Sequence, residues 1–324
     1  MTVEPATRVL KADSAAIEAA ARCLRQGGLV AFPTETVYGL GADAHNGEAV
    51  ARLYAAKGRP AFNPLIAHVA DAEDARLLGR FDAPAEKLAA RFWPGPLTLV
   101  LPKLADCPVA DLALAGLDSV AVRVPAHPLA HALLAAFDGP VVAPSANRSG
   151  HVSPTTAAHV LADLRGRIDM VLNGGPCTVG VESTIVSCLG APALLRPGGV
   201  ARESIERVLD HALALPAAEQ EAPLAPGMLN SHYAPKARLR LNAEAPRAGE
   251  AFLAFGPDAP RASGLSLNLS PHGHLIEAAA KLFSHLRALD ASGVAAIAVM
   301  RVPHEGLGEA INDRLKRAAA PRQG

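Results

Sequence analysis

The sequence predicts an α/β protein with a mixed sheet, followed by a second and smaller α/β domain. The chain has 324 residues, a length that favours two domains over one. Helical and strand-like patterns alternate through its first two-thirds, as expected for an α/β fold. A proline-rich stretch, residues 215–235, then separates this part from residues 236–324, where the alternation resumes. We therefore predict a first domain over residues 1–214 and a second over residues 236–324.

The predicted elements of the first domain begin with a helix. Ser14 is expected to cap this helix, and Gly27 and Gly28 are expected to end it. Asn46 is expected to cap a second helix that ends near Gly58. Two more helices are predicted at residues 127–137 and 155–164. Apolar runs predict strands at residues 29–32, 97–101, 120–124, 141–143 and 184–186.

The second domain has its own alternation of strands and helices. Strands are predicted at residues 239–241, 251–255 and 294–300, and helices at residues 275–289 and 307–319. The preceding stretch, residues 215–235, contains four prolines and is predicted to be a linker. It ends in Ser-His-Tyr-Ala-Pro, which is unusually aromatic for a spacer. We therefore predict that the linker closes over a site as a lid, with the second domain as its anchor.

Composition excludes several classes of protein. Half of the residues are hydrophobic and 19% are charged, which is typical of a globular protein. The four cysteines form no CxxC pair, so reduced thiols in a cytoplasmic protein are expected. The acidic start and the absence of a long apolar run predict neither a signal peptide nor a membrane span. Residues 1–235 carry a net charge of −4 and residues 236–324 of +4. One function to consider is a double-stranded RNA-binding module, which needs positive charge along a groove. The net negative charge of residues 1–235 disfavours it.

Three polar segments carry the first functional signals. Residues 33–41 (PTETVYGLG) place two hydroxyls and a carboxylate just past a strand end, where α/β proteins bind ligands. Lys57 and Arg59 flank a glycine at a helix end, which suits either an anion or the helix dipole. Arg123 lies in an otherwise apolar strand and needs a partner. The sequence leaves open whether that partner is a protein carboxylate or a ligand anion.

Short polar loops follow further strands. Residues 144–150 (PSANRSG), 180–185 (GVESTI) and 195–198 (LRPG) each carry serine, threonine, asparagine or arginine. Several such loops can converge on one cation-lined site. A P-loop, a dinucleotide-binding GxGxxG and a serine-hydrolase GxSxG elbow are all absent from the sequence.

Together these segments resemble the Sua5/YrdC family of threonylcarbamoyl-AMP synthases. The matching pieces also include KGRP and NPL within residues 57–65, FWPGPLTLVL at 92–101 and VRVP at 122–125. Their order spans about 200 residues, and MLNSHYAP at 228–235 leads into an extra domain, as in the longer Sua5 type. The resemblance implies a twisted α/β sheet with a concave, positively lined cavity. A second enzyme alternative is carbamoyl transfer, for which related domains are fused to zinc-finger segments that this chain lacks.

The resemblance also implies a reaction and its participants. L-threonine, bicarbonate and ATP would give threonylcarbamoyl-AMP and pyrophosphate, with Mg²⁺ accompanying ATP and held largely by its phosphates. The product would pass to a complex that transfers the threonylcarbamoyl group to a tRNA adenosine, with at most weak RNA contact by this chain. No metal ligand of the protein itself is implied.

The resemblance also implies roles for individual residues of this chain. The threonine pocket is implied to contain Thr36, His68, Arg123, Ala143 and Ser183. The nucleotide site is implied to contain Lys57, Arg59, Asn63, Ser119, Ser145, Ser153, Arg196 and Tyr233, with Asn147 as a weaker addition. No general base is assigned, although Glu35 and Glu182 are the nearest motif carboxylates.

Overall fold

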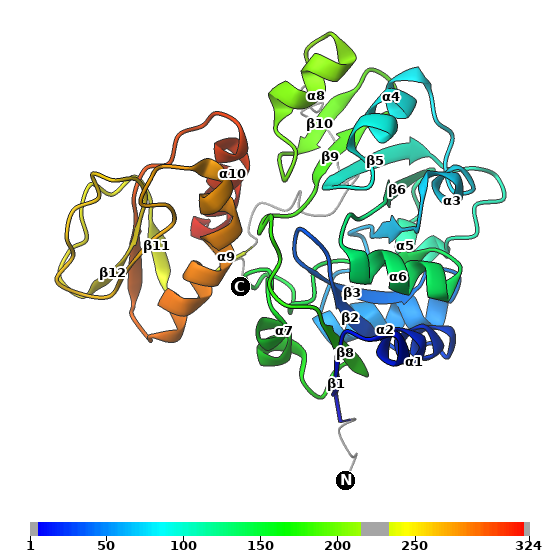
Figure 1. The fold of residues 1–324 in the computed structure, drawn as a ribbon, viewed down its shortest axis with the longest axis horizontal. Helices are drawn as coiled ribbons and strands as arrows, with labels where there is room; N and C mark the ends of the chain where they lie inside the picture. Colours follow the sequence, from blue (N-terminus) through cyan, green and yellow to red (C-terminus); the bar gives the residue numbers. More distant parts are fainter. Residues whose placement is uncertain (1–5, 215–232, 321–324) are drawn as a thin grey trace.

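The computed structural model describes residues 6–214 and 233–320, and these form two sheets with flanking helices (Figure 1). The first sheet is mixed and has ten strands; the second is parallel and has four. The predicted α/β class, with a large mixed sheet and a small second sheet, is confirmed. No helix of the described residues is long and apolar enough to cross a membrane.

The first sheet combines parallel and antiparallel pairs. From one edge to the other its strands are β1 (Arg8–Lys11), β8 (Met170–Asn173), β2 (Val30–Pro33), β3 (Tyr38–Asp43), β7 (Val141–Val142), β4 (Ile66–His68), β6 (Ser119–Arg123), β5 (Leu97–Pro102), β9 (Thr184–Ser187) and β10 (Ala193–Arg196). β2 and β3 form an antiparallel hairpin, whereas β4 and β6 run parallel. The segment between β2 and β3 is therefore a tight polar turn at the sheet centre.

Helices cover both faces of this sheet. Val30 and Phe32 of β2 pack with α1 (Ser14–Arg25) and α6 (Pro128–Phe137). Ala31 lies between them in sequence and faces the opposite way, toward a larger core. That core includes α2 (Gly47–Lys57), α4 (Ala83–Phe92), α5 (Asp111–Leu114), α7 (Ala157–Leu164) and α8 (Arg202–Leu209). A short helix, α3 (Ala72–Arg76), precedes α4.

The hairpin strand β3 was not predicted from the sequence. Its glycines interrupt the apolar pattern, so the sequence predicts a polar turn over all of residues 33–41 and no strand there. The structure explains the glycines by close packing: a Cβ atom on Gly41 would lie 2.9 Å from the side chains of Phe32 and Val141. The short strands β1, β4, β8 and β10 were also missed, as were the strand Ser266–Asn268 and the helices α3, α4, α5 and α8.

The helix boundaries confirm most of the predicted signals. Asn46 caps α2, and Gly58 ends it in the left-handed region with φ +60°. The cap of α1 was predicted wrongly. Asp13 rather than Ser14 is the N-cap, and its Oδ1 accepts a hydrogen bond from the Ala16 amide at 2.7 Å. Ser14 is instead the first residue of the helix.

This correction has a direct test. Asp13→Ala is expected to lower the free energy of unfolding by about 1 kcal/mol, because an amide of the first turn loses its acceptor. Ser14→Ala, its matched control, is expected to change stability by a few tenths of a kcal/mol at most. Urea unfolding followed by circular dichroism measures both. Equal losses in the two variants would contradict the assigned cap.

The second sheet comprises β11 (Arg238–Arg240), β14 (Ala296–Val299), β12 (Glu250–Ala254) and β13 (Ser266–Asn268), in that order. Its helices are α9 (Leu275–Ala291) and α10 (Leu307–Ala319), both close to the predicted bounds. Figure 1 shows α9 and α10 on the side of this sheet that faces the first domain. The helices thus form the surface through which the second domain contacts the first.

The two domains contact each other through ion pairs and through apolar side chains. Arg314 of α10 pairs with Glu182, Arg287 of α9 with Asp163, and Arg202 of α8 with Glu309 of α10. One apolar cluster joins Val37, Val152 and Val181 to the second domain. Residues 215–232, most of the predicted linker and lid, lie outside the described residues. Tyr233, near the end of the predicted linker (residues 215–235), is described and is buried.

Candidate active site

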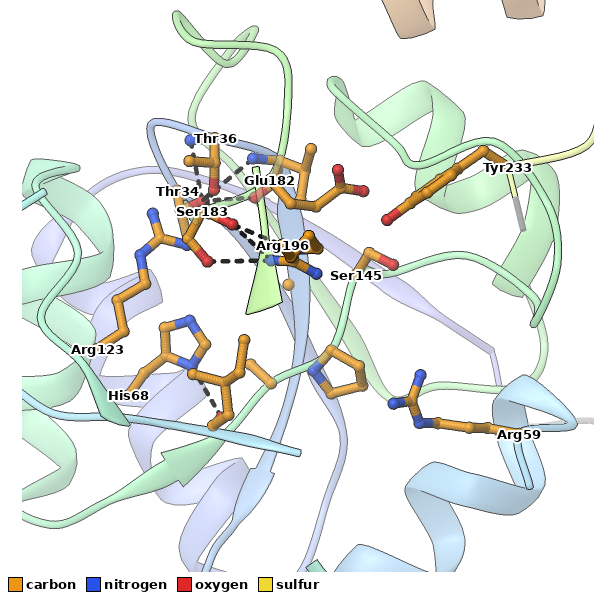
Figure 2. A pocket seen from close by; sticks show the side chains of 15 residues that line it. Thr34, Thr36, Arg59, His68, Arg123, Ser145, Glu182, Ser183, Arg196 and Tyr233 are labelled. Atoms are coloured by element: carbon orange, nitrogen blue, oxygen red, sulfur yellow. Dashed lines mark hydrogen bonds between the residues drawn. The ribbon is translucent and has the colours of Figure 1, made fainter. Parts of the chain in front are cut away.

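A cavity with a largely polar lining lies among the loops and strand ends of the first sheet. Its wall draws on most of the motifs noted in the sequence, although no residue of the 92–101 motif lines it. The lining residues are Thr34, Thr36, Val37, Gly39, Arg59, Ile66, His68, Arg123, Ala143, Pro144, Ser145, Glu182, Ser183, Arg196 and Tyr233 (Figure 2). Figure 2 shows Arg123 and His68 toward one end, Arg59 and Tyr233 toward the other, and Arg196 between them.

Strand alternation places the polar groups on one face. His68 follows Ile66 by two residues, and Arg123 follows Ala121 by two, so each pair shares a side of the sheet. Ile66 and Ala121 belong to one small apolar cluster on that side. Ser183 stands in the same relation to Ile185 of that cluster. The sheet therefore directs these side chains to a common space.

Arg123 is 4% exposed and is held by the turn between β2 and β3. Its Nη2 pairs with Glu35 at 2.6 Å, its Nη1 donates to the Thr36 hydroxyl at 3.0 Å, and its Nε donates to the Gly95 carbonyl at 3.2 Å. A protein carboxylate thus pairs Arg123, which answers the question left open by the sequence. Three of its five N–H groups are directed at these partners. Two remain for a ligand, as far as the described residues show.

Two threonines organise the same turn. The Thr34 hydroxyl donates to the Val37 carbonyl at 2.7 Å, and the hydroxyls of Thr34 and Thr36 are 2.7 Å apart. Because each hydroxyl has one proton, Thr36 donates to Thr34 and accepts from Arg123. The turn therefore holds a row of polar atoms on the cavity wall.

His68 is a neutral imidazole in this setting. Burial, together with the nearby charge of Arg123, lowers its pKa to about 3. Its Nδ1 lies 3.1 Å from the Ile66 carbonyl, which can only accept, so Nδ1 carries the proton. His68 therefore adds no positive charge to the cavity near neutral pH.

The middle of the cavity is built by two adjacent loops. Arg196 donates to the Ser183 carbonyl at 2.8 Å and to the Ser183 hydroxyl at 3.1 Å. Glu182 accepts from Ser153 at 2.5 Å and from Arg314 at 2.8 Å. Burial disfavours its charge, but Arg314 and Arg196 more than offset this and lower its pKa to about 2. Glu182 is therefore ionised and a weak proton acceptor.

Arg59 and Tyr233 lie at the other end. Arg59 donates to the carbonyls of Asn63 and Pro64, at 3.3 and 3.1 Å. Burial lowers its pKa to about 10, so it stays charged at neutral pH. The Tyr233 ring stacks on Phe283, with centroids 5.5 Å apart. A cation and an aromatic ring thus border the same space.

All five residues predicted for threonine line this cavity, as do Arg59, Ser145, Arg196 and Tyr233 of the nucleotide set. The other four nucleotide candidates, Lys57, Asn63, Ser119 and Ser153, are not among the lining residues. Lys57 donates to the carbonyls of Ser145 and Asn147, so it holds the 144–150 loop. Direct ligand contact by these four remains a prediction.

The remaining candidates are placed by their neighbours. Ser153 donates to Glu182, and Ser119 begins β6, four residues before Arg123. Asn63 is buried, and its Oδ1 has no partner among the described residues. Asn147 Oδ1 accepts from Ser145 at 2.5 Å, which shapes the loop from within. Their positions suit support of the cavity wall at least as well as ligand contact.

Several lining residues were absent from the predicted set. Thr34, Val37 and Gly39 belong to the 33–41 motif, and Pro144 to the 144–150 motif, so motif membership could have included them. Ile66 carried no polar signal. No cluster of three or more His, Cys, Asp or Glu residues suitable for a metal ion occurs in the described ranges. The lining has three arginines and one carboxylate, a composition suited to anions.

Comparison with known proteins agrees with this geometry. A family model described as "Telomere recombination", for Sua5, YciO and YrdC proteins, matches residues 22–198. A model described as "Threonylcarbamoyl-AMP synthase, C-terminal domain" matches residues 200–320. The chain is 42% identical to a threonylcarbamoyl-AMP synthase of Bacillus subtilis, over 98% of this chain and 96% of that protein. This chain belongs to the Sua5/YrdC family of threonylcarbamoyl-AMP synthases.

Other members of the Sua5/YrdC family show the same extent of similarity. A threonylcarbamoyl-AMP synthase of Schizosaccharomyces pombe is 38% identical over 94% of this chain and 88% of its own length. The crystal structure of Pyrococcus abyssi Sua5 complexed with L-threonine matches with a TM-score of 0.89 and 39% identity, covering 97% of each chain. The predicted family, of the two-domain Sua5 type, is confirmed.

Proposed function

We propose that this chain condenses L-threonine, bicarbonate and ATP into threonylcarbamoyl-AMP and releases pyrophosphate. The observation that carries the proposal is one cavity in which three arginines, a neutral histidine and a row of hydroxyls converge. Near-full-length similarity to threonylcarbamoyl-AMP synthases, and to a Sua5 protein complexed with L-threonine, supports the same reaction. The product would serve modification of a tRNA adenosine through a separate transfer complex.

The cavity suggests where each substrate lies. The carboxylate of threonine fits the Arg123 end, where two N–H groups of that guanidinium are available to donate to it. The phosphates of ATP fit near Arg196 and the nucleoside toward Arg59 and Tyr233. ATP would enter with its Mg²⁺, since the lining carboxylate Glu182 already accepts two hydrogen bonds.

The chemistry needs positioning more than an acid or base from the protein. The threonine amine attacks CO₂, or attacks bicarbonate with loss of water, and forms a carbamate. A carbamate oxygen then attacks the α-phosphorus of ATP, and the bond to the bridging oxygen breaks as pyrophosphate leaves. Arginines that neutralise phosphate charge and align the two substrates lower this barrier. Glu182, with its pKa about 2, is a poor base, so the amine proton would pass to solvent or bicarbonate.

Pyrophosphate release tests the reaction. Purified protein is expected to release pyrophosphate and form an AMP-containing product when threonine and bicarbonate are both present. Leaving out either substrate, or replacing threonine with alanine, is expected to reduce release to background. A coupled pyrophosphate assay and mass spectrometry measure the two products. Equal ATP turnover without threonine would identify an ATPase instead.

The proposed nucleotide end predicts a selective loss. Arg59→Ala is expected to weaken ATP binding by roughly 10- to 150-fold, because a charge-assisted hydrogen bond contributes about 1.5–3 kcal/mol. Threonine binding should change far less. Calorimetry with each ligand measures both, and Arg76→Ala is the control because Arg76 pairs with Glu86 on an exposed surface. An Arg59→Ala protein that binds ATP like the parent would rule out this placement.

A further inference from the structure

Arg314 of α10 is a fully buried arginine of the second domain, and besides Asp313 of its own helix it contacts residues outside that domain. Its Nε donates to Glu182 at 2.8 Å and its Nη1 to the Pro197 carbonyl at 2.9 Å. Its guanidinium carbon lies 5.3 Å from the centre of the Tyr233 ring. Glu182 and Tyr233 line the cavity, whereas Arg314 is behind them. One side chain thus contacts two neighbouring pieces of the cavity wall.

Each of these pieces is held from two sides. Glu182 accepts from Arg314 through one oxygen and from Ser153 through the other, so its carboxylate cannot rotate without losing a bond. The Tyr233 ring is bordered by Arg314 and by Phe283 of α9. Tyr233 also has a positive φ of 64°, an uncommon backbone conformation for a residue with a side chain. Its orientation therefore depends on the second domain.

We propose that Arg314 is a positioning residue through which the second domain sets the nucleotide end of the cavity, by orienting Glu182 and Tyr233. The proposal rests on the proposed function, because it assigns that end of the cavity to ATP. A buried guanidinium is costly unless it is paired. Its presence at the domain contact therefore makes the shape of the cavity wall dependent on the docking of α10.

The other ion pairs between the domains provide matched controls. Arg202–Glu309 and Arg287–Asp163 join the same two parts of the chain. None of these four side chains lines the cavity. A variant that loses one of these pairs therefore shows how much weaker contact between the domains alone lowers ATP affinity, without a direct change in the cavity wall. Arg202→Met is the better control, since Arg287 also donates to the Val152 carbonyl, next to Ser153, which holds Glu182.

ATP affinity measured by calorimetry, without threonine and below the unfolding temperature, tests the proposal. Arg314→Met is expected to weaken ATP binding at least about 10-fold, the loss typical for a charge-assisted contact and its oriented neighbours. Threonine affinity should change by less than about threefold, because Arg123 and Thr36 lie at the other end. Arg202→Met should leave both affinities as in the parent. Equal ATP affinity in Arg314→Met and the parent would overturn the proposal.

A second variant separates positioning from simple loss of folding. Glu182→Gln removes the charge that Arg314→Met leaves unpaired, while keeping both acceptor and shape. The Arg314→Met/Glu182→Gln protein is expected to regain thermal stability toward the parent but not ATP affinity, because the Tyr233 ring still lacks its contact with the Arg314 guanidinium. Full recovery of ATP affinity would reduce Arg314 to a counter-charge and overturn the positioning role. So would an Arg314→Lys protein with parental ATP affinity, since lysine cannot span Glu182, Pro197 and the ring together.

A pH series adds a readout that mere weakening of the fold would not change. Glu182 is faced by Arg314 of α10, by Arg196 of β10, by Ser153 and by Tyr233, and Asp313 pairs with Arg314. In the parent its low pKa keeps it ionised across the assay range. Without Arg314, burial raises that pKa, so protonation begins at higher pH. ATP affinity of Arg314→Met should then begin to change at a higher pH than in the parent as the pH is lowered, and the double variant should not follow this change.

The two hypotheses fail in different ways. A parent protein that binds ATP but forms no threonylcarbamoyl-AMP would contradict the proposed reaction. The role of Arg314 would then still be decided by the ATP affinities of the variants. A parent that binds no ATP would overturn both. A parent that performs the reaction, with an Arg314→Met variant indistinguishable from Arg202→Met, would overturn the inference alone.

Discussion

Replacing Arg123 with methionine is expected to weaken threonine binding by roughly 10- to 150-fold and to lower the free energy of unfolding by about 3–5 kcal/mol. The first loss follows because the guanidinium is the cation nearest the proposed carboxylate site. The second follows because Glu35, paired with Arg123 at 2.6 Å, would be left in a buried position without its counter-charge. Calorimetry with threonine and urea unfolding measure the two effects separately.

A second substitution distinguishes the two roles of Arg123. Glu35→Gln in the Arg123→Met background removes the unpaired charge, so stability should recover by a large part of the loss. Threonine affinity should stay low, because no cation returns to that end of the cavity. Recovery of both properties would mean that Arg123 serves the fold alone. Parental threonine affinity in a folded Arg123→Met protein would mean that the carboxylate binds elsewhere.

Gly180→Ala is expected to destabilise the protein by about 2–5 kcal/mol, through a contact between the two domains. Gly180 has a φ of +78°, and a Cβ atom there would lie 2.4 Å from the Ala279 carbonyl oxygen and the Ala280 Cα. Both atoms belong to the backbone of α9, which cannot rotate away as a side chain can. The cost combines about 1–2 kcal/mol of left-handed backbone strain with about 1–3 kcal/mol of overpacking.

Gly175→Ala provides the control for backbone strain. Gly175 has a similar φ of +83°, but a Cβ atom there would meet nothing within 4 Å. The difference between the two variants in urea unfolding is therefore the cost of pushing α9 away from the first domain. If Gly180→Ala lost no more stability than Gly175→Ala, the close approach of α9 would be wrong. ATP affinity should also fall in Gly180→Ala, since α9 carries the partner of the Tyr233 ring.

The helix boundaries illustrate how far local sequence signals reach. Asn46 and Gly58 bound α2 as predicted, because a cap depends on residues within one turn of the helix. Asp13 displaced Ser14 as the cap of α1 for an equally local reason. Both can accept the amide hydrogen bond, and their order along the chain does not say which adopts the extended backbone. The strand β3 was missed because Gly41 is required by close packing against Phe32 and Val141. These two residues are far apart along the chain, so a short stretch of sequence cannot show that both lie beside it.

The sequence by itself determined the α/β class, the motifs and, through their resemblance, the family and most of the cavity wall. These follow from short-range periodicity and from residue types kept at set spacings. Only the tertiary structure decided that Glu35 is the partner of Arg123 and that Lys57 supports a loop. It alone showed that Arg314, a residue in no motif, contacts the wall from another domain. The physical reason is that a buried charge is stabilised by whichever opposite charge the fold brings near, and these partners are 88 and 132 residues away along the chain.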